Sequence, residues 1–501
     1  MIKNMRKIFF AGCALLLCAG FARVQAQEKD ALSEQQLKMM EAFHIVSAAD
    51  IEQWARTLVS DEYRGRRSGD IGYDMAADFV IEHFKEWGIQ PKGDNGTYEN
   101  TFAQPYCDVK GVGFLKVSYA IGKDTVVKNY VAREDYFPTA LSDGGEATGE
   151  LVYVGYGINA PELGYNDYKG MDLTGKIVLC EGGFPYKGKN LDSLKMWNKY
   201  LRAQPKIAAA KAAGAKGLLF VSKYANPMPM QTPGMIVAFI SKETAQELLS
   251  GTGRSFDEWH KRFDEFKGKP VPTGHIVSVG AENTFYGDRT TANIVGVIEG
   301  SDPVLKNEYI VLGAHIDHLG MLPEIYPGAQ DNVSGSVITM AAAKALALSK
   351  VDMKRSVVIV LFASEELGVL GSEHFLKTMP FPKEKVTCMI NTDMLATGTG
   401  FMVHSSNEWS DLVPYFRTAS EDWARRPFRA NLTPWEYKAR LFTDGNLFQN
   451  FQIPTFELKT TGGKWPAPYH VPEDTMDQLD PVIMADAART MAIAVIQIAN
   501  K

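Results

Sequence analysis

The sequence has few cysteines, no excess of positive charge and no long uninterrupted apolar run. Of its five cysteines, two lie within the first 26 residues. The other three, Cys107, Cys180 and Cys388, are too few for a disulfide framework, and the apolar surroundings of Cys180 and Cys388 predict buried thiols. The net charge of −6 provides no general attraction to nucleic acid or to anionic membranes, so we expect neither as a partner.

The first residues have the pattern of an export signal. Three basic residues precede an apolar run at residues 8–21, and Val24-Gln25-Ala26 is a suitable cleavage site. The run is shorter than the roughly 18 apolar residues that a membrane-spanning helix needs. We therefore interpret residues 1–26 as a signal peptide. The protein is then expected to be exported, periplasmic or secreted, without stable membrane insertion after cleavage.

A chain of 501 residues is too long for one ordinary domain. From residue 286 to residue 501, strand and helix patterns alternate, which predicts an α/β fold with a mainly parallel, mixed sheet flanked by helices. Residues 141–285 have short β-like runs and many glycines, and we interpret them as an inserted β-rich domain. Residues 45–140, with an amphipathic helix at 72–87, are then the first part of the main domain.

Metal-binding residue types follow three of the predicted strands of the main domain. His315 and Asp317 follow one strand, the pair Glu365-Glu366 follows another, and Asp393 follows a third. Ligands of parallel sheets gather at the carboxyl ends of the strands, so we expect these side chains to lie close together. Each residue alone has an ordinary interpretation, such as helix capping, but the ordered series favours a metal site.

The series has the ligands for two zinc ions that share one carboxylate. Zinc in catalytic sites binds imidazole and carboxylate groups, with three protein ligands per ion and one open position. Two ions with one shared carboxylate need five ligands, and five residues supply them: His315, Asp331, Glu366, Asp393 and His470. Asp317 is predicted to orient His315, and Glu365 remains free to act as a base. His318 and His374 lie near these motifs, but no required role is left for them.

Five motifs of the main domain resemble those of the co-catalytic zinc aminopeptidases of metallopeptidase clan MH. They are GAHIDHLG (313–320), GAQDNVSG (328–335), ASEELG (363–368), NTDM (391–394) and YH (469–470). The resemblance implies the zinc-peptidase fold, related to phosphorylases and hydrolases. It implies His315 and Asp393 on one zinc ion, Glu366 and His470 on the other, and Asp331 between them.

The resemblance also implies further features of the site and of the middle segment. Glu365 is then the general base, Asp317 orients His315, and the Asp331–Asn332 peptide bond is cis. Residues 152–179 resemble the protease-associated domain that is often inserted in such enzymes. We predict that the inserted domain shapes access of substrates to the site.

The predicted function is that of an exported di-zinc aminopeptidase acting on peptides or proteins with a free N-terminus. A carboxypeptidase of the same fold is the first alternative, although it needs arginines facing the metals and no ligand motif has one adjacent. A non-catalytic peptide-binding protein is the second alternative, and intact Glu365 and ligands disfavour it. A glutaminyl-cyclase-like enzyme with one zinc is disfavoured by the presence of both His315 and Asp393.

Overall fold

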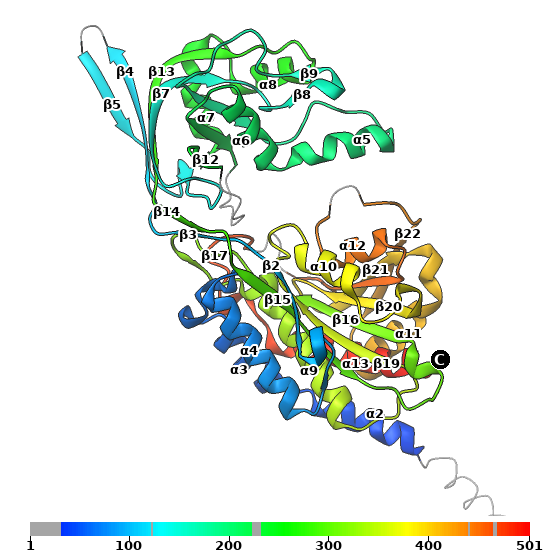
Figure 1. The fold of residues 1–501 in the computed structure, drawn as a ribbon. Helices are drawn as coiled ribbons and strands as arrows, with labels where there is room; N and C mark the ends of the chain where they lie inside the picture. The colour runs from blue at the N-terminus through cyan, green and yellow to red at the C-terminus, as the bar shows by residue number, and fades with distance from the viewer. Residues whose placement is uncertain (1–31, 122–123, 223–231, 439–440, 464–467) are drawn as a thin grey trace, which may run out of the picture.

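The computed structural model describes residues 32–121, 124–222, 232–438, 441–463 and 468–501. The predicted signal peptide, residues 1–26, lies outside them and stays a prediction. The described residues form two parts, each with a sheet of its own, joined by a pair of extended strands (Figure 1).

The main part is built on a nine-stranded sheet. In spatial order its strands are β1 (Gln90–Pro91), β15 (Thr290–Ile298), β19 (Ser356–Phe362), β16 (Tyr309–His315), β20 (Val386–Thr392), β23 (Thr455–Thr461), β21 (Gly400–Ser406) and β22 (Phe428–Thr433), while β2 (Glu99–Ala103) also pairs with β15. The central strands β19, β16, β20 and β23 are parallel, and β15 and β21 join them antiparallel. This arrangement confirms the predicted α/β fold with a mainly parallel, mixed sheet.

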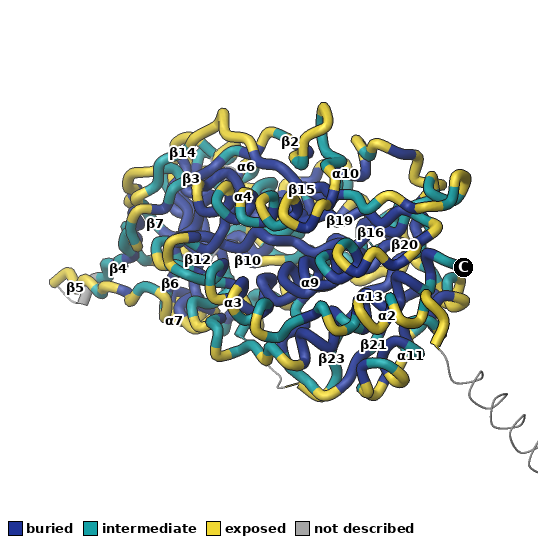
Figure 2. The backbone as a smooth tube through the Cα atoms, turned by 90° about the horizontal axis from the view of Figure 1, so that it is seen from below, coloured by how far each residue is buried: buried dark blue, intermediate teal, exposed yellow. Residues whose placement is uncertain are grey.

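The central strands are continuously apolar because both faces of the sheet are covered. In β19, Val357, Ile359 and Leu361 pack into the core on one face, and the alternate residues pack into a second core on the other. Figure 2 shows β16, β19 and β20 as mostly buried. The first face is covered by α2 (Glu34–Ile45), α3 (Ala48–Leu58), α4 (Ile71–Glu86), α9 (Ser334–Leu348) and α13 (Pro481–Ala499), and the second by α10 (Leu370–Thr378) and α12 (Asp444–Asn450).

Helix α13 is long and apolar enough, by length and composition, to cross a membrane. However, 78% of its most apolar window is buried inside the structure, and its residues pack against α9 and α3. It is therefore a core helix of the main part. The thiols predicted to be buried, Cys180 and Cys388, are buried and free, as is Cys107.

The second part contains an eight-stranded sheet. In spatial order its strands are β5 (Asp124–Asn129), β4 (Phe114–Ile121), β13 (Val271–Ala281), β7 (Gly145–Tyr153), β10 (Ile177–Glu181), β11 (Gly217–Val221), β12 (Ile236–Ile240) and β6 (Tyr136–Phe137). This sheet begins at Phe114, ahead of the boundary predicted at residue 141. The early strand β5 is exposed along almost its whole length, so its sequence lacks the alternation that marks a half-buried strand.

The two parts are joined covalently at one place and also touch elsewhere. Strands β3 (Tyr106–Val109) and β14 (Asn283–Tyr286) pair antiparallel, so the chain leaves and re-enters the main part at adjacent points. Arg133 of the inserted part forms ion pairs with Glu324 (2.7 Å) and Glu473 (3.3 Å) of the main part. The ammonium group of Lys195, on α5 (Leu191–Asn198), lies 4.8 Å from the ring centre of Tyr437. Figure 1 shows α5 on the side that faces the main part.

Candidate metal centre

Three neighbouring parallel strands end where the predicted ligands begin. His315 is the last residue of β16 and lies level with Phe362 at the end of β19, three residues before Glu365. Asp393 directly follows β20, which pairs with β16 on its other side. The topology therefore brings three separate motifs to one edge of the sheet, as their sequence positions predicted.

The first group of ligand atoms surrounds the imidazole of His315. Its Nε2 atom lies 3.4 Å from Asp331 Oδ1 and 3.6 Å from Asp393 Oδ1, and all three side chains are buried. These three ligand atoms lie close enough together to hold one ion.

The second group lies on the other oxygen of Asp331. His470 Nε2 lies 3.2 Å from Asp331 Oδ2 and 2.9 Å from Glu366 Oε2. Each carboxylate oxygen of Asp331 thus faces a different imidazole, which is the geometry that a bridging ligand requires.

The role of Asp317 differs in part from the prediction. His315 Nδ1 donates to the backbone carbonyl of Asp317 (3.1 Å), and the Asp317 carboxylate lies farther away, at 3.7 Å. That carboxylate accepts the backbone N–H groups of Glu365 (3.1 Å) and Glu366 (3.4 Å) instead. The backbone carbonyl of Asp317 therefore fixes the proton of His315 on Nδ1, which leaves Nε2 as the acceptor that faces the site. The side chain of Asp317 holds the backbone of Glu365 and Glu366 in place.

The adjacent glutamates have opposite electrostatic environments. Burial raises the pKa of Glu365 well above its usual value, so this carboxyl group can hold a proton. Burial also disfavours the charged form of Glu366, but the facing His470 and His318 outweigh it and lower the pKa of Glu366 below its usual range. The pair thus separates into one group suited to carry a proton and one suited to bind a cation.

Several buried polar atoms of the site make no hydrogen bond. Among the described residues, Glu366 Oε1, Asp393 Oδ1 and both ring nitrogens of His318 lack a hydrogen-bond partner. Unpaired buried polar atoms are costly, and their convergence here fits a site completed by cations. His318 has no exposed surface, and its Nδ1 atom forms an ion-pair contact of 2.7 Å with Glu366 Oε1 that lacks the direction of a hydrogen bond; the sequence predicted no role for this histidine.

The sequence analysis predicted no role for two supporting residues, Arg66 and Asp474. The buried Arg66 donates to the carbonyls of Ile316 (2.9 Å), Pro327 (2.7 Å) and Gly328 (3.0 Å), and so fastens two loops of the site. The Asp474 carboxylate accepts the backbone N–H groups of Gln330 (2.9 Å) and Asp331 (3.0 Å). In the sequence Arg66 stands in a turn-rich patch at residues 64–69, which predicts no such contacts.

The loop that holds Asp331 has the predicted backbone geometry. The Asp331–Asn332 peptide bond is cis, as the resemblance implied. The amide group of Asn332 donates to the carbonyl of Thr392 (3.0 Å) and accepts from the backbone of Gly335 (2.9 Å). The loop is thereby connected to the end of β20, next to Asp393.

Known proteins resemble the chain over both parts. Residues 293–495 match peptidase family M28, and residues 147–248 match the PA domain. A probable leucine aminopeptidase 2 of Aspergillus oryzae is 32% identical over 228 residues, which are 45% of this chain and 38% of that protein. The chain thus spans well under half the length of this relative.

Solved structures with the same fold cover nearly the whole chain. An aminopeptidase from Aneurinibacillus sp. strain AM-1 has a TM-score of 0.60 at 19% identity and covers 92% of this chain and 95% of its own. A zinc aminopeptidase from Bacillus subtilis has a TM-score of 0.59 at 19% identity and covers 90% and 95%. At this identity the likeness shows the fold, which includes the predicted inserted domain. The chain therefore contains a peptidase family M28 domain and an inserted PA domain.

Proposed function

We propose that the protein is an exported aminopeptidase that uses two zinc ions. One observation carries the proposal: the two oxygens of Asp331 face two different imidazoles, with Asp393 completing one group and Glu366 the other. His315, Asp331 and Asp393 would hold one ion, and Asp331, Glu366 and His470 the other. When bound, zinc supplies Lewis acidity that polarises a carbonyl group and makes water more acidic.

Glu365 is the proton carrier of the proposed reaction. Its neighbour Glu366 faces His470 as one of the proposed zinc ligands. Glu365, with its raised pKa, can therefore take a proton from the attacking water. It then passes that proton to the leaving amine. Asp317 positions both glutamates through their backbone N–H groups, so the base and the ligand keep a fixed relative placement.

The acidic lining of the site fits a substrate with a free amino terminus. Five carboxyl groups gather there, and a charged carboxylate accepts strong hydrogen bonds from a protonated amine. They are Asp317, Asp331, Glu365, Glu366 and Asp393. The names of the relatives, leucine aminopeptidases, support the same substrate class.

One observation favours the carboxypeptidase alternative. The exposed Arg202 of the inserted domain approaches Gly368, two residues after Glu366, so closely that a Cβ atom on Gly368 would lie 3.0 Å from its guanidinium group. An arginine at this place could bind the carboxylate end of a short peptide.

A matched pair of substrates separates the two activities. A dipeptide with a free amine should be cleaved, and the same dipeptide with an acetylated amine should not. Cleavage of both at similar rates would replace the aminopeptidase proposal by the carboxypeptidase alternative.

The two glutamates test the proposed mechanism. Glu365→Gln should keep its zinc but lose roughly 10²–10⁴-fold in rate, because glutamine has the same size and cannot accept the proton. Glu366→Gln is the matched control and should weaken zinc retention. Zinc content and rate are measured for both variants. If Glu365→Gln lost zinc while Glu366→Gln kept it, the two roles would have to be exchanged.

Export is tested separately from activity. The mature protein purified from its native cells should begin at Gln27 and be found outside the cytoplasm. A protein that retained Met1 and stayed in the cytoplasm would contradict the proposed export.

A further inference from the structure

Strand β5 forms one edge of the eight-stranded sheet in the inserted domain. Among the described strands its only neighbour is β4, and Figures 1 and 2 show β5 at the outer side of a hairpin that extends beyond the rest of this domain. The opposite edge of the same sheet is β6, which has only two residues, whereas β5 has six. A longer edge strand offers a further strand a longer row of backbone hydrogen-bonding groups.

The hydrogen bonds between β4 and β5 show which backbone groups face outward. The backbone N–H of Tyr130, just after β5, donates to the carbonyl of Leu115 on β4 (3.0 Å). Hydrogen-bonded pairs alternate with unbonded pairs along antiparallel strands, so every second residue of β5 turns its backbone groups away from β4. Counted from Tyr130 in the observed register, these residues are Thr125, Val127 and Asn129.

The side chains of β5 leave this edge open. Val126 and Val127 are 37% and 53% exposed, and β5 pairs with β4 without a bulge. Proteins commonly protect an edge strand with a bulge, a proline or a lysine. The lysine of β5, Lys128, is directed instead to Glu247 on α7 (Lys242–Leu248), with its ammonium group 2.6 Å from the carboxylate. The exposed β-branched residues therefore suit this edge to pairing with another strand.

We propose that β5 of a second copy of the chain pairs with this edge, antiparallel and about a two-fold axis at Val126. Val126 then lies opposite its own copy, and Thr125 lies opposite Val127, so that these outward-facing residues exchange their backbone hydrogen bonds. The same register places Asp124 opposite Lys128 on both sides of the axis, which stabilises the pairing through opposite charges. An axis at Val127 would place Lys128 opposite Val126 and would separate these charges.

The resulting assembly is a closed dimer joined by one continuous sheet. Each β5 is used once, so the two-fold pairing ends at two copies. All proposed zinc ligands lie in the peptidase domain, so each copy keeps its own candidate metal centre. A contact through one strand is small for a protein interface, and the dimer should therefore dissociate on dilution.

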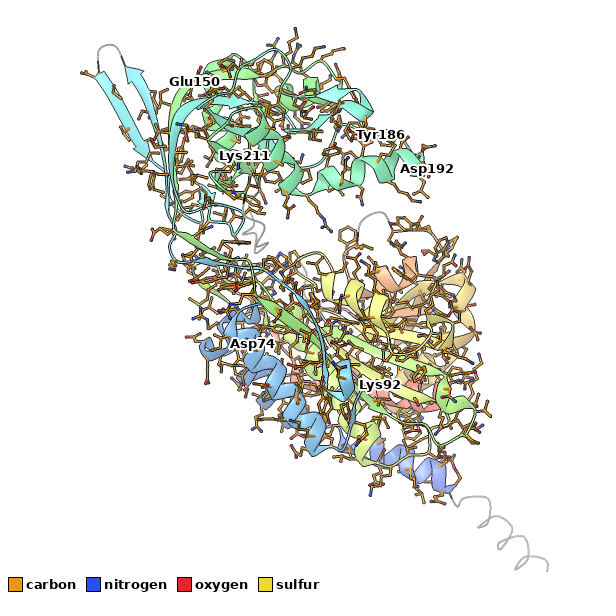
Figure 3. The ribbon with its side chains drawn as sticks, in the orientation of Figure 1. Asp74, Lys92, Glu150, Tyr186, Asp192 and Lys211 are labelled. Atoms are coloured by element: carbon orange, nitrogen blue, oxygen red, sulfur yellow. The ribbon has the colours of Figure 1, made fainter. Side chains whose placement is uncertain are left out.

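Sedimentation equilibrium of the wild-type protein from about 1 to 100 μM tests the proposal. The average mass should rise toward that of two chains at the upper end. Asp124→Lys should keep the mass of one chain, because it places like charges opposite each other. Val127→Pro should do the same, because it removes an outward-facing N–H group and leaves the bonds to β4 intact. The matched control is Asp192→Lys, which makes the same charge change at an exposed position of α5 (labelled in Figure 3) and should still form the dimer.

A mixture of two variants tests the register. Asp124→Lys and Lys128→Glu should each be monomeric alone, and their equal mixture should form a dimer, because each variant then supplies the charges that the other lacks. A wild-type protein with the mass of one chain at every concentration would overturn the proposal. So would a dimer that persisted in Asp124→Lys, since another surface would then join the copies; this exposed position also decides the matter if Val127→Pro fails to fold. Either result would leave the proposed zinc function standing.

Discussion

The inserted domain and the peptidase domain both bury charged groups, but they surround them in different ways. In the inserted domain the ammonium group of Lys206, fully buried, donates to the carbonyls of Tyr156 (2.7 Å), Glu181 (3.1 Å) and Gly183 (2.8 Å). Its three N–H groups therefore match three acceptors. In the peptidase domain Glu366 Oε1 and Asp393 Oδ1 are equally buried and have no hydrogen-bond partner in the described structure.

A comparison of two histidines, His260 of the inserted domain and His318 of the peptidase domain, shows a similar contrast. In the inserted domain His260 Nδ1 lies 2.7 Å from Glu181 Oε2, and the other oxygen of Glu181 accepts from the hydroxyl group of Tyr153. The hydroxyl group of Tyr156 in turn donates to Asp264, next to the same histidine. In the peptidase domain the Nδ1 atom of the buried His318 also lies 2.7 Å from a glutamate oxygen, Glu366 Oε1, but without the direction of a hydrogen bond, and its Nε2 atom has no hydrogen-bond partner among the described residues.

The difference in hydrogen bonding distinguishes buried polar groups that stabilise the fold from those that bind a ligand. Buried polar groups whose hydrogen bonds are complete stabilise one conformation and leave nothing to bind. Buried polar groups that converge without partners are unfavourable unless a ligand completes them. We therefore assign the charged cluster of the inserted domain to stability and that of the peptidase domain to metal binding.

Loss of a ligand should have the largest effect. His470→Ala should release one of the two zinc ions and remove several kcal/mol of transition-state stabilisation, roughly a 10³-fold loss of rate. Metal analysis and the rate of release of an N-terminal residue measure the two effects. His404→Ala, in a strand away from the site, is the control and should retain both ions. A His470→Ala protein with full activity would end the proposed ligand assignment.

Lys206→Met should have the largest effect of any change in the inserted domain. Unlike His470→Ala, it should lower stability and leave zinc binding unchanged. It leaves three buried carbonyls without their donor and should cost roughly 3–5 kcal/mol of stability. Zinc content should not change, since no ligand lies in this domain. Thermal unfolding and metal analysis check both points.

The control for Lys206→Met is Lys211→Met, at an exposed position on the same helix, α6 (Ala203–Ala212) (labelled in Figure 3). It should change stability by no more than about 0.5 kcal/mol. Loss of zinc in Lys206→Met, with the fold intact, would show that the two clusters are not independent.

The smallest expected effect depends on pH. The hydrogen bond with Glu181 raises the pKa of His260 although partial burial opposes it. Because the pKa of His260 is higher in the folded state, its interaction with Glu181 stabilises the fold fully below the unfolded-state pKa of about 6.5. This stabilisation is lost as the pH rises through the folded-state pKa. His260→Gln should therefore lower the melting temperature more at pH 5.5 than at pH 8.5, and solvent screening should keep the effect within about 1 kcal/mol. An equal loss at both pH values would contradict this.

The sequence predicted the parts of the site that depend on strand ends. His315, Glu365 and Asp393 could be placed together because each follows an apolar run, and parallel strands end at one edge of a sheet. The start of the inserted domain could not be placed, since β5 is too exposed to show a strand pattern.

The sequence could not reveal residues whose roles depend on distant partners. Arg66 binds carbonyls of segments that lie some 250 residues away in the chain, so no local pattern marks it. His318 stands one residue after a predicted functional residue, and only its burial and its distance from Glu366 distinguish it from an ordinary loop histidine. Both residues show that supporting groups of a site are harder to predict than its ligand motifs.

Hydrogen–deuterium exchange of the full chain, first loaded with zinc and then treated with a chelator, tests the central comparison most directly. The account predicts that removal of zinc speeds the exchange of amides around His315, Asp331, Glu366 and Asp393, because their side chains lose the ions that complete them. Amides of the inserted domain, including those near Lys206, should exchange at unchanged rates. Unchanged exchange at the strand ends, or an equal increase in the inserted domain, would contradict the account.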